Sequence, residues 1–105
     1  MTDPPQATRL ADLVAYQDGS IVSRIVLKGE TGSVTLFAFD AGQELSEHTA
    51  PFDALVQVVE GEAVVTIAGR PHRLGAGEVI VMPAGQPHAV RAAARFKMLL
   101  TMLRR

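Results

Sequence analysis

The chain has 105 residues, of which 48% are hydrophobic and 20% are charged, and it contains no cysteine. This length suits one domain, and the composition excludes a disordered or coiled-coil protein. The formal net charge of −1 excludes a basic surface for nucleic acid, and the lack of cysteine excludes disulfides and thiolate metal sites. No apolar stretch approaches the roughly 18 residues of a membrane helix, and no export signal is visible. We therefore expect a cytoplasmic protein that binds neither nucleic acid nor membrane.

Short apolar runs along the chain predict its strands. Residues 1–9 contain two prolines among mostly polar neighbours, so we expect a flexible tail there and one folded domain over residues 10–105. Residues 7–15 fit either a short helix or a strand. From residue 20 onward, glycine or proline interrupts the apolar runs about every 8 to 12 residues, which predicts an all-β antiparallel sandwich or barrel. The runs are 21–27, 34–39, 54–59, 63–68, 79–82 and 96–103.

The segments between these runs carry the residues that favour turns. Glycine in the Glu-Gly-Glu segment at 60–62 predicts a turn between the runs 54–59 and 63–68. Pro83 and Pro87 bound a predicted loop, because proline cannot donate a hydrogen bond to a sheet ladder.

Two of the runs, 54–59 and 98–103, do not alternate apolar with polar residues as a half-exposed strand does. A barrel buries one face of each strand, and a large exposed apolar patch on the other face would be unusual. We therefore predict a homodimer. The alternative is that the chain's own terminal strands cover these faces.

The three histidines, His48, His72 and His88, are the candidate chemical groups. His48 lies in a segment with the spacing G-x5-H-x-A-x3-A-x6-G, which begins at Gly42 and ends at Gly61. His88 lies in a segment with the spacing G-x5-P-x-G-x2-H-x3-A, which begins at Gly77 and ends at Ala92. Both segments resemble, in register, the two motifs of the cupin superfamily. The resemblance implies a single-domain antiparallel double-stranded β-helix, that is, a jelly-roll barrel.

The resemblance also implies where a metal would bind. In cupins the positions of His48, Ala50, Ala54 and His88 together hold three histidines and one glutamate around a divalent metal. Such nitrogen and oxygen ligands suit Ni, Fe, Mn or Zn. Only His48 and His88 are retained here, and an alanine methyl group cannot coordinate a metal. The sequence thus predicts an incomplete metal site.

Other side chains are expected to surround the two histidines in an apolar pocket. Side chains alternate along a strand, which places Ser46 on the side of His48, and Gln86 is expected on the side of His88. Met82 precedes the Pro83 loop and is pliable enough to border a small cavity. His72 lies outside both motifs and is read as an ordinary strand residue. Further candidates for the core and the pocket wall are Phe37, Phe39, Phe52, Met98 and Met102.

Three functions remain open from the sequence. The first is a cupin-like protein that binds a small molecule around His48 and His88 without robust metal chemistry. The second is a metal-dependent enzyme of the dioxygenase, isomerase or decarboxylase type, which the two retained histidines favour. The third is an oligomeric scaffold, because fold alone does not determine function.

Overall fold

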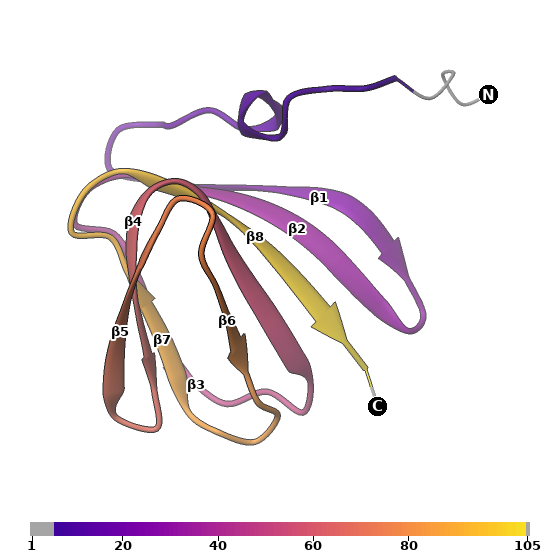
Figure 1. The fold of residues 1–105 in the computed structure, drawn as a ribbon, viewed down its shortest axis with the longest axis vertical. Helices are drawn as coiled ribbons and strands as arrows, with labels where there is room; N and C mark the ends of the chain where they lie inside the picture. The colour runs from indigo at the N-terminus through magenta and orange to yellow at the C-terminus, as the bar shows by residue number, and fades with distance from the viewer. Residues whose placement is uncertain (1–5, 105) are drawn as a thin grey trace.

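One short helix and eight strands are formed by residues 6–104, the part of the chain that this computed structural model describes (Figure 1). The 3-10 helix η1 spans Leu10–Leu13. The strands are β1 Ile21–Gly29, β2 Gly32–Phe39, β3 Glu44–His48, β4 Asp53–Ile67, β5 Arg70–Gly75, β6 Val79–Met82, β7 His88–Arg91 and β8 Phe96–Leu103. The predicted all-β fold is therefore confirmed.

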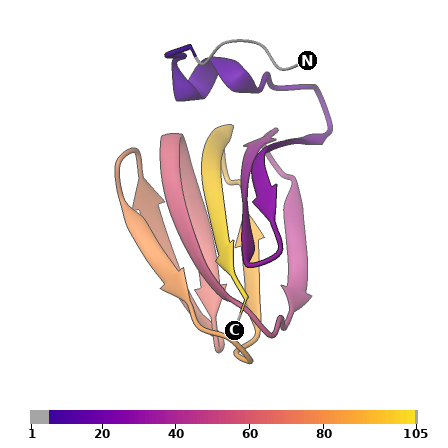
Figure 2. The ribbon, with the colours of Figure 1, turned by 90° about the vertical axis from the view of Figure 1, so that its right-hand side faces the viewer.

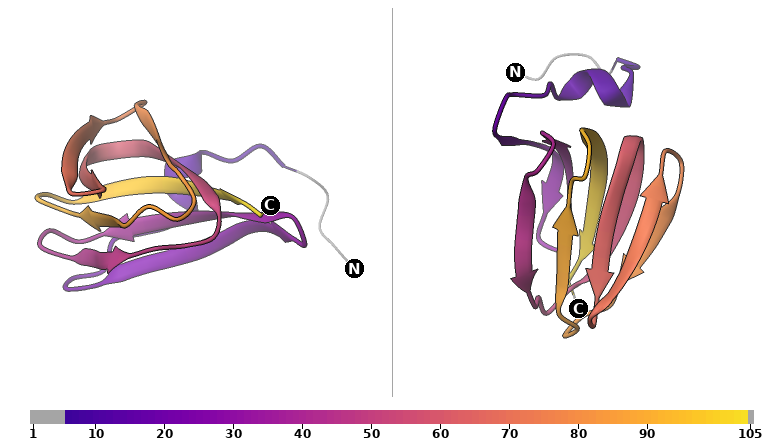
Figure 3. Two further views of the ribbon diagram at one scale, coloured as in Figure 1. Left: turned by 90° about the horizontal axis from the view of Figure 1, so that it is seen from below. Right: turned by 90° about the vertical axis from the view of Figure 1, so that its left-hand side faces the viewer.

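All the strand pairs are antiparallel, and β4 takes part in two sheets. The first half of β4 lies between β8 and β6, so that one sheet, here the front sheet, has the order β1-β2-β8-β4-β6. The second half lies between β5 and β7, so that the other, the back sheet, has the order β5-β4-β7-β3. Figure 3 shows the two sheets curling toward each other. The result is the expected jelly-roll barrel.

Gly61 marks the place where β4 passes from the front sheet to the back sheet. The turn predicted at 60–62 is wrong, because one strand runs from Asp53 to Ile67. The pairing of β4 with β8 changes register between Val58 and Glu60, and Gly61 has a φ of +78°. A bulge of this kind bends a strand, and glycine adopts the positive φ with little strain. The glycine thus bends a strand instead of ending it.

The remaining expected runs correspond to β1, β2, β6 and β8, whereas β3, β5 and β7 were not predicted. The unpredicted strands are four to six residues long and have polar sequences such as Glu-Leu-Ser-Glu-His in β3. Most residues of β3 and β5 are exposed, so they lack the apolar run by which a strand is recognised. These three strands form because they pair with each other or with β4 in the back sheet.

The barrel interior is an apolar core between the two sheets. Phe39 and Phe96 stack with their ring centroids 4.5 Å apart, and both rings are fully buried. Val56 and Val58 from the front half of β4 and Val65 from its back half are also completely buried. One continuous core therefore holds the sheets together.

The N-terminal segment lies across one end of the barrel (Figure 2) and packs on the outer face of the front sheet. Val14 is buried against Leu36 and Ala38 of β2. The Tyr16 hydroxyl donates a hydrogen bond of 2.7 Å to Glu60, and burial together with this carboxylate raises the pKa of Tyr16. Residues 7–15 thus form one 3-10 turn in an otherwise irregular segment. Of the predicted tail, residues 6–9 are exposed or nearly so and form no regular element, and residues 1–5 lie outside the described part.

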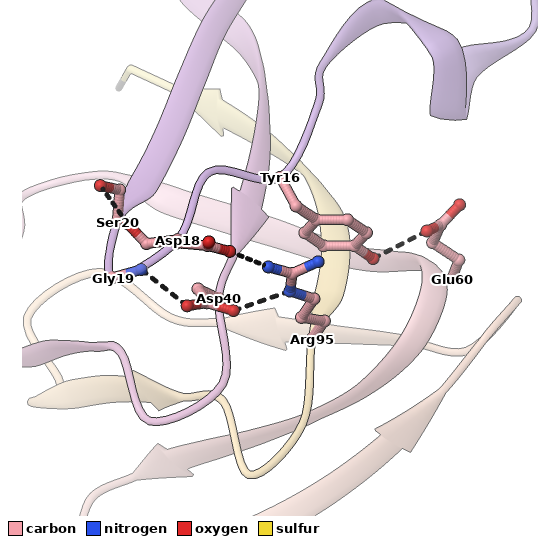
Figure 4. A network of polar contacts seen from close by, with 7 residues as sticks. All are labelled: Tyr16, Asp18, Gly19, Ser20, Asp40, Glu60 and Arg95. Atoms are coloured by element: carbon pink, nitrogen blue, oxygen red, sulfur yellow. Dashed lines mark hydrogen bonds and ion pairs between the residues drawn. The ribbon is translucent and has the colours of Figure 1, made fainter.

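A second polar cluster fastens the same segment to the barrel (Figure 4). Arg95 forms ion pairs with Asp40, at 2.7 Å, and with Asp18. The Arg95 hydrogen bond and the Gly19 backbone N–H hold the pKa of Asp40 at about 2. Asp40 therefore stays ionised down to strongly acidic pH.

The other end of the outer face of the front sheet carries an apolar row that no described residue covers. Its members are successive cross-strand partners on five neighbouring strands, so they share one face. Three of them are exposed large apolar side chains. The row is Leu27, Val34, Thr101, Leu55 and Val81.

Candidate functional site

A cavity of about 60 Å³ lies inside the barrel between the two sheets. Its lining is apolar apart from two histidine side chains, His48 and His88. His48 is the last residue of β3 and His88 is the first residue of β7, and the two are directly opposite each other in the antiparallel pair. The other lining residues are Leu45, Ala50, Phe52, Ala54, Met82, Val90, Met98, Leu100 and Met102.

A bulge in β3 turns His48 toward the cavity. Leu45 pairs with Val90 and His48 pairs with His88, so two residues of β3 stand opposite the single Ala89 of β7. The extra residue reverses the side-chain alternation, and Leu45 and His48 consequently line the same cavity. Strict alternation from His48 would have put Leu45 on the other face.

The two imidazole rings form a hydrogen-bonded pair, and the Ser46 carbonyl oxygen indicates which ring nitrogen donates. The Nε2 atoms of His48 and His88 are 3.1 Å apart, and the rings meet edge to face with centroids 4.4 Å apart. His48 Nδ1 lies 2.8 Å from the Ser46 carbonyl oxygen. Because a carbonyl only accepts, this contact assigns the proton of neutral His48 to Nδ1 and makes its Nε2 an acceptor. His88 therefore donates from its Nε2.

The buried side of His88 has no comparable partner. His88 is 6% exposed, and its Nδ1 has no hydrogen-bond partner within the described residues. Burial lowers the pKa of His88, the neighbouring His48 lowers it further, and the Gln86 backbone opposes the shift. His88 is thus held in its neutral form near pH 7.

The residues predicted for the site are brought together in part. Met82 and Met98 are buried and line the cavity, and the partly buried Phe52 and Met102 line it too. Ser46 and Gln86 are exposed and are not lining residues, although the Ser46 carbonyl orients His48. His72 is exposed on β5, away from the cavity.

Sequence reasoning missed three apolar residues of the cavity wall, Leu45, Val90 and Leu100. Val90 lies two residues from His88, and Leu100 lies two residues from Met98. Because side chains alternate along a strand, assigning His88 and Met98 to the interior predicts that Val90 and Leu100 also point inward. Leu45 carries no such signal, because the bulge that turns it inward is visible only in the pairing of β3 with β7.

The metal implied by the sequence resemblance can be tested against these donors. Two nitrogen atoms 3.1 Å apart can both bond one ion at about 2.0–2.1 Å. The other two ligand positions hold the methyl groups of Ala50 and Ala54, which line the same cavity. No three His, Cys, Asp or Glu side chains within residues 6–104 form a group that could hold a metal ion. The donor set therefore does not fit the four-ligand metal.

Comparison with known proteins identifies the family. The cupin domain model matches residues 35–102, more than half of the chain. A conserved protein of unknown function from Streptococcus pyogenes is 34% identical over 99% of this chain and 91% of its own, with a TM-score of 0.93. A cupin 2 conserved barrel domain protein from Leptotrichia buccalis is 40% identical over 90% of this chain and 46% of its own, with a TM-score of 0.87.

A third solved structure, a cupin superfamily protein from Desulfitobacterium hafniense, is 28% identical over 98% of this chain and 94% of its own, with a TM-score of 0.92. No curated protein matches the chain significantly. Within residues 6–104, no helix has the length and apolar character needed to span a membrane. The match of the domain model and the likeness to these structures show that the chain belongs to the cupin family.

Proposed function

We propose that this cupin binds a small, largely apolar organic molecule in the cavity at His48 and His88, and that binding does not require a metal. The observation that carries the proposal is the hydrogen-bonded histidine pair set in an otherwise apolar wall. A concave apolar site with a few polar groups is the usual form of a small-molecule pocket.

The histidine pair would select the polar group of the ligand. His88 Nε2 donates and His48 Nε2 accepts, so the pair offers one donor and one acceptor that face each other. A hydroxyl group both donates and accepts at a single oxygen atom. We therefore expect a ligand hydroxyl to replace the hydrogen bond between the two histidines, with its apolar body against Met82 and Leu100.

The exposure of the two rings supports access from solvent on one side. His48 is exposed, whereas His88 is almost completely buried. A ligand would approach past His48 and meet His88 at the inner end. An unpartnered buried nitrogen such as His88 Nδ1 costs about 1–3 kcal/mol, which is tolerated at functional sites more often than in ordinary cores.

The test is a titration of the protein with straight-chain alcohols, from ethanol, which is small enough for a cavity of about 60 Å³, to 1-octanol, followed by NMR of the histidine rings and methionine methyl groups. We expect saturable shifts at His48, His88 and Met82, and no shift at the exposed His72. Ala54→Leu fills the cavity and should abolish the shifts while the chain stays folded. Shifts that persist in the filled variant would contradict the proposed site.

Metal content is measured on the same protein by elemental analysis. We expect alcohol binding to be unchanged by a chelator. A stoichiometric metal that is lost in both His48→Ala and His88→Ala would overturn the metal-independent proposal and favour the metal-dependent enzyme.

A further inference from the structure

A second hollow lies beside the cavity, on the inner side of the β1–β2 hairpin. This hairpin groove has a volume of about 250 Å³. Figure 1 shows the hairpin extending to one side of the barrel. Phe52 and Met102 line both the groove and the histidine cavity, so the two hollows adjoin. Other residues of the groove wall are Lys28, Ser33, Thr35 and Arg104.

One row of cross-strand partners connects the groove with the cavity. Lys28 pairs with Ser33, Ser33 with Met102, Met102 with Ala54, and Ala54 with Met82. Directly paired residues project from the same face, and neighbouring strands are about 4.8 Å apart. Lys28 and Ala54 are three strand spacings apart, which is about 14 Å along the inner wall. The cation and the cavity thus belong to one continuous surface.

The groove is positively charged. Lys28 and Arg104 line the groove, and its wall contains no aspartate or glutamate. Glu30, in the nearby hairpin turn, is not a lining residue. Neither cation forms an ion pair within the described residues. The Arg104 guanidinium lies over the Phe52 ring, 5.6 Å from its centroid, and the Arg104 backbone N–H donates to the Thr31 carbonyl oxygen. The backbone of Arg104 is therefore anchored while its charge stays available.

We propose that the hairpin groove binds the carboxylate of a small amphipathic acid whose apolar body runs across Met102 and Phe52 toward the histidine cavity. This inference rests on the proposed function and deepens it by naming the ligand class. Guanidinium and ammonium groups both donate charge-assisted hydrogen bonds to a carboxylate, and the hydroxyls of Ser33 and Thr35 add neutral donors. The flexible Met102 side chain, shared by both hollows, can yield to the apolar chain.

The test compares octanoate with 1-octanol, which has an apolar chain of the same length and no charge. Isothermal titration calorimetry measures both ligands on the unaltered protein and on Lys28→Gln, Arg104→Gln and the double variant. The matched control is Arg70→Gln, because Arg70 is an exposed cation on β5, outside both hollows. Thermal melts confirm that each variant is folded.

We expect octanoate to bind more tightly than 1-octanol. Each exposed charge should contribute about two- to fivefold in octanoate affinity, so the double variant should lose about four- to twenty-five-fold. Its affinity for 1-octanol should not change, and Arg70→Gln should change neither ligand. Raised salt should weaken octanoate binding only.

The results separate this inference from the proposed function. If 1-octanol shifts the cavity resonances but octanoate binds no better, or the groove variants leave octanoate affinity intact, the groove inference is overturned and the proposed function stands. An equal loss in Arg70→Gln would overturn the inference too, because attraction would then be unspecific. If neither ligand binds, both proposals fail.

Discussion

Replacing Gly61 by alanine should destabilise the barrel strongly, because two separate effects act at this residue. Gly61 has a φ of +78°, and a residue with a Cβ pays about 1–2 kcal/mol in the left-handed region. A Cβ there would also lie 2.3 Å from the Arg95 carbonyl oxygen and 2.8 Å from the Phe96 Cα. Both are backbone atoms that cannot rotate away, so β4 and β8 must move apart, at about 1–3 kcal/mol. We expect a total loss of about 2–5 kcal/mol.

The assay is urea denaturation followed by circular dichroism, and the matched control is Gly69→Ala. Gly69 has a φ of +80°, but a Cβ there meets nothing within 4 Å. The control should therefore lose only about 1–2 kcal/mol, and the difference between the two variants isolates the backbone clash. A loss of about 3 kcal/mol lowers the melting temperature of a domain this size by about 12–24 °C. If Gly61→Ala loses no more stability than Gly69→Ala, the reasoning about the bend in β4 is refuted.

Three further predictions concern the site and the surface. Burial lowers the pKa of His88 below its ordinary value of about 6.5, so the contribution of neutral His88 to stability is complete above pH 6.5 and is lost as the pH falls from there toward the folded-state pKa. Urea denaturation between pH 8 and pH 5 should show this loss of stability, and the loss should be smaller in His88→Phe. The double variant Ala50→His/Ala54→Glu places two further donors beside His48 and His88, so calorimetry should show tighter binding of Zn or Ni than in the unaltered protein. Unchanged metal affinity would show that the cavity cannot accept the added side chains. The homodimer stays a prediction, and we expect its interface on the apolar row of the front sheet, so light scattering should give twice the chain mass. Val81→Lys should give the monomer, whereas Ala76→Lys in the exposed β5–β6 turn should leave the dimer intact. A monomeric unaltered protein would contradict the prediction.

The strands that the sequence predicted are those with an apolar-rich sequence. β1, β2, β6 and β8 were each recognisable because they are rich in the β-branched and large apolar residues that strands favour. β3 and β5 were not predicted because their sequences are mostly polar and exposed. Each forms a strand by pairing with a distant segment, β7 for β3 and β4 for β5, which the local sequence does not reveal. Gly61 was read as a turn for the same reason: glycine at positive φ serves both a turn and a bulge, and only the β8 partner distinguishes them.

The two histidines of the site were found through the motif spacing that resembles the cupin pattern. Their mutual contact, with Nε2 atoms 3.1 Å apart, could not be obtained from spacing alone, since it depends on the register of β3 against β7. The same register decided the neighbours. Ser46 shares the even numbering of His48, yet Leu45 takes the cavity position because of the extra residue in β3.

By itself, the amino-acid sequence determined the all-β class, the glycine and proline positions at which the chain bends, and the alanines at two positions where the cupin resemblance implies metal ligands. These are local properties: backbone freedom, apolar runs and the chemistry of single side chains. The tertiary structure alone decided that His48 and His88 form a pair with an orphaned nitrogen, and that Lys28 shares an inner wall with the cavity. Such relations arise from strand register, which is set by contacts between segments far apart in the chain and shifts with every bulge.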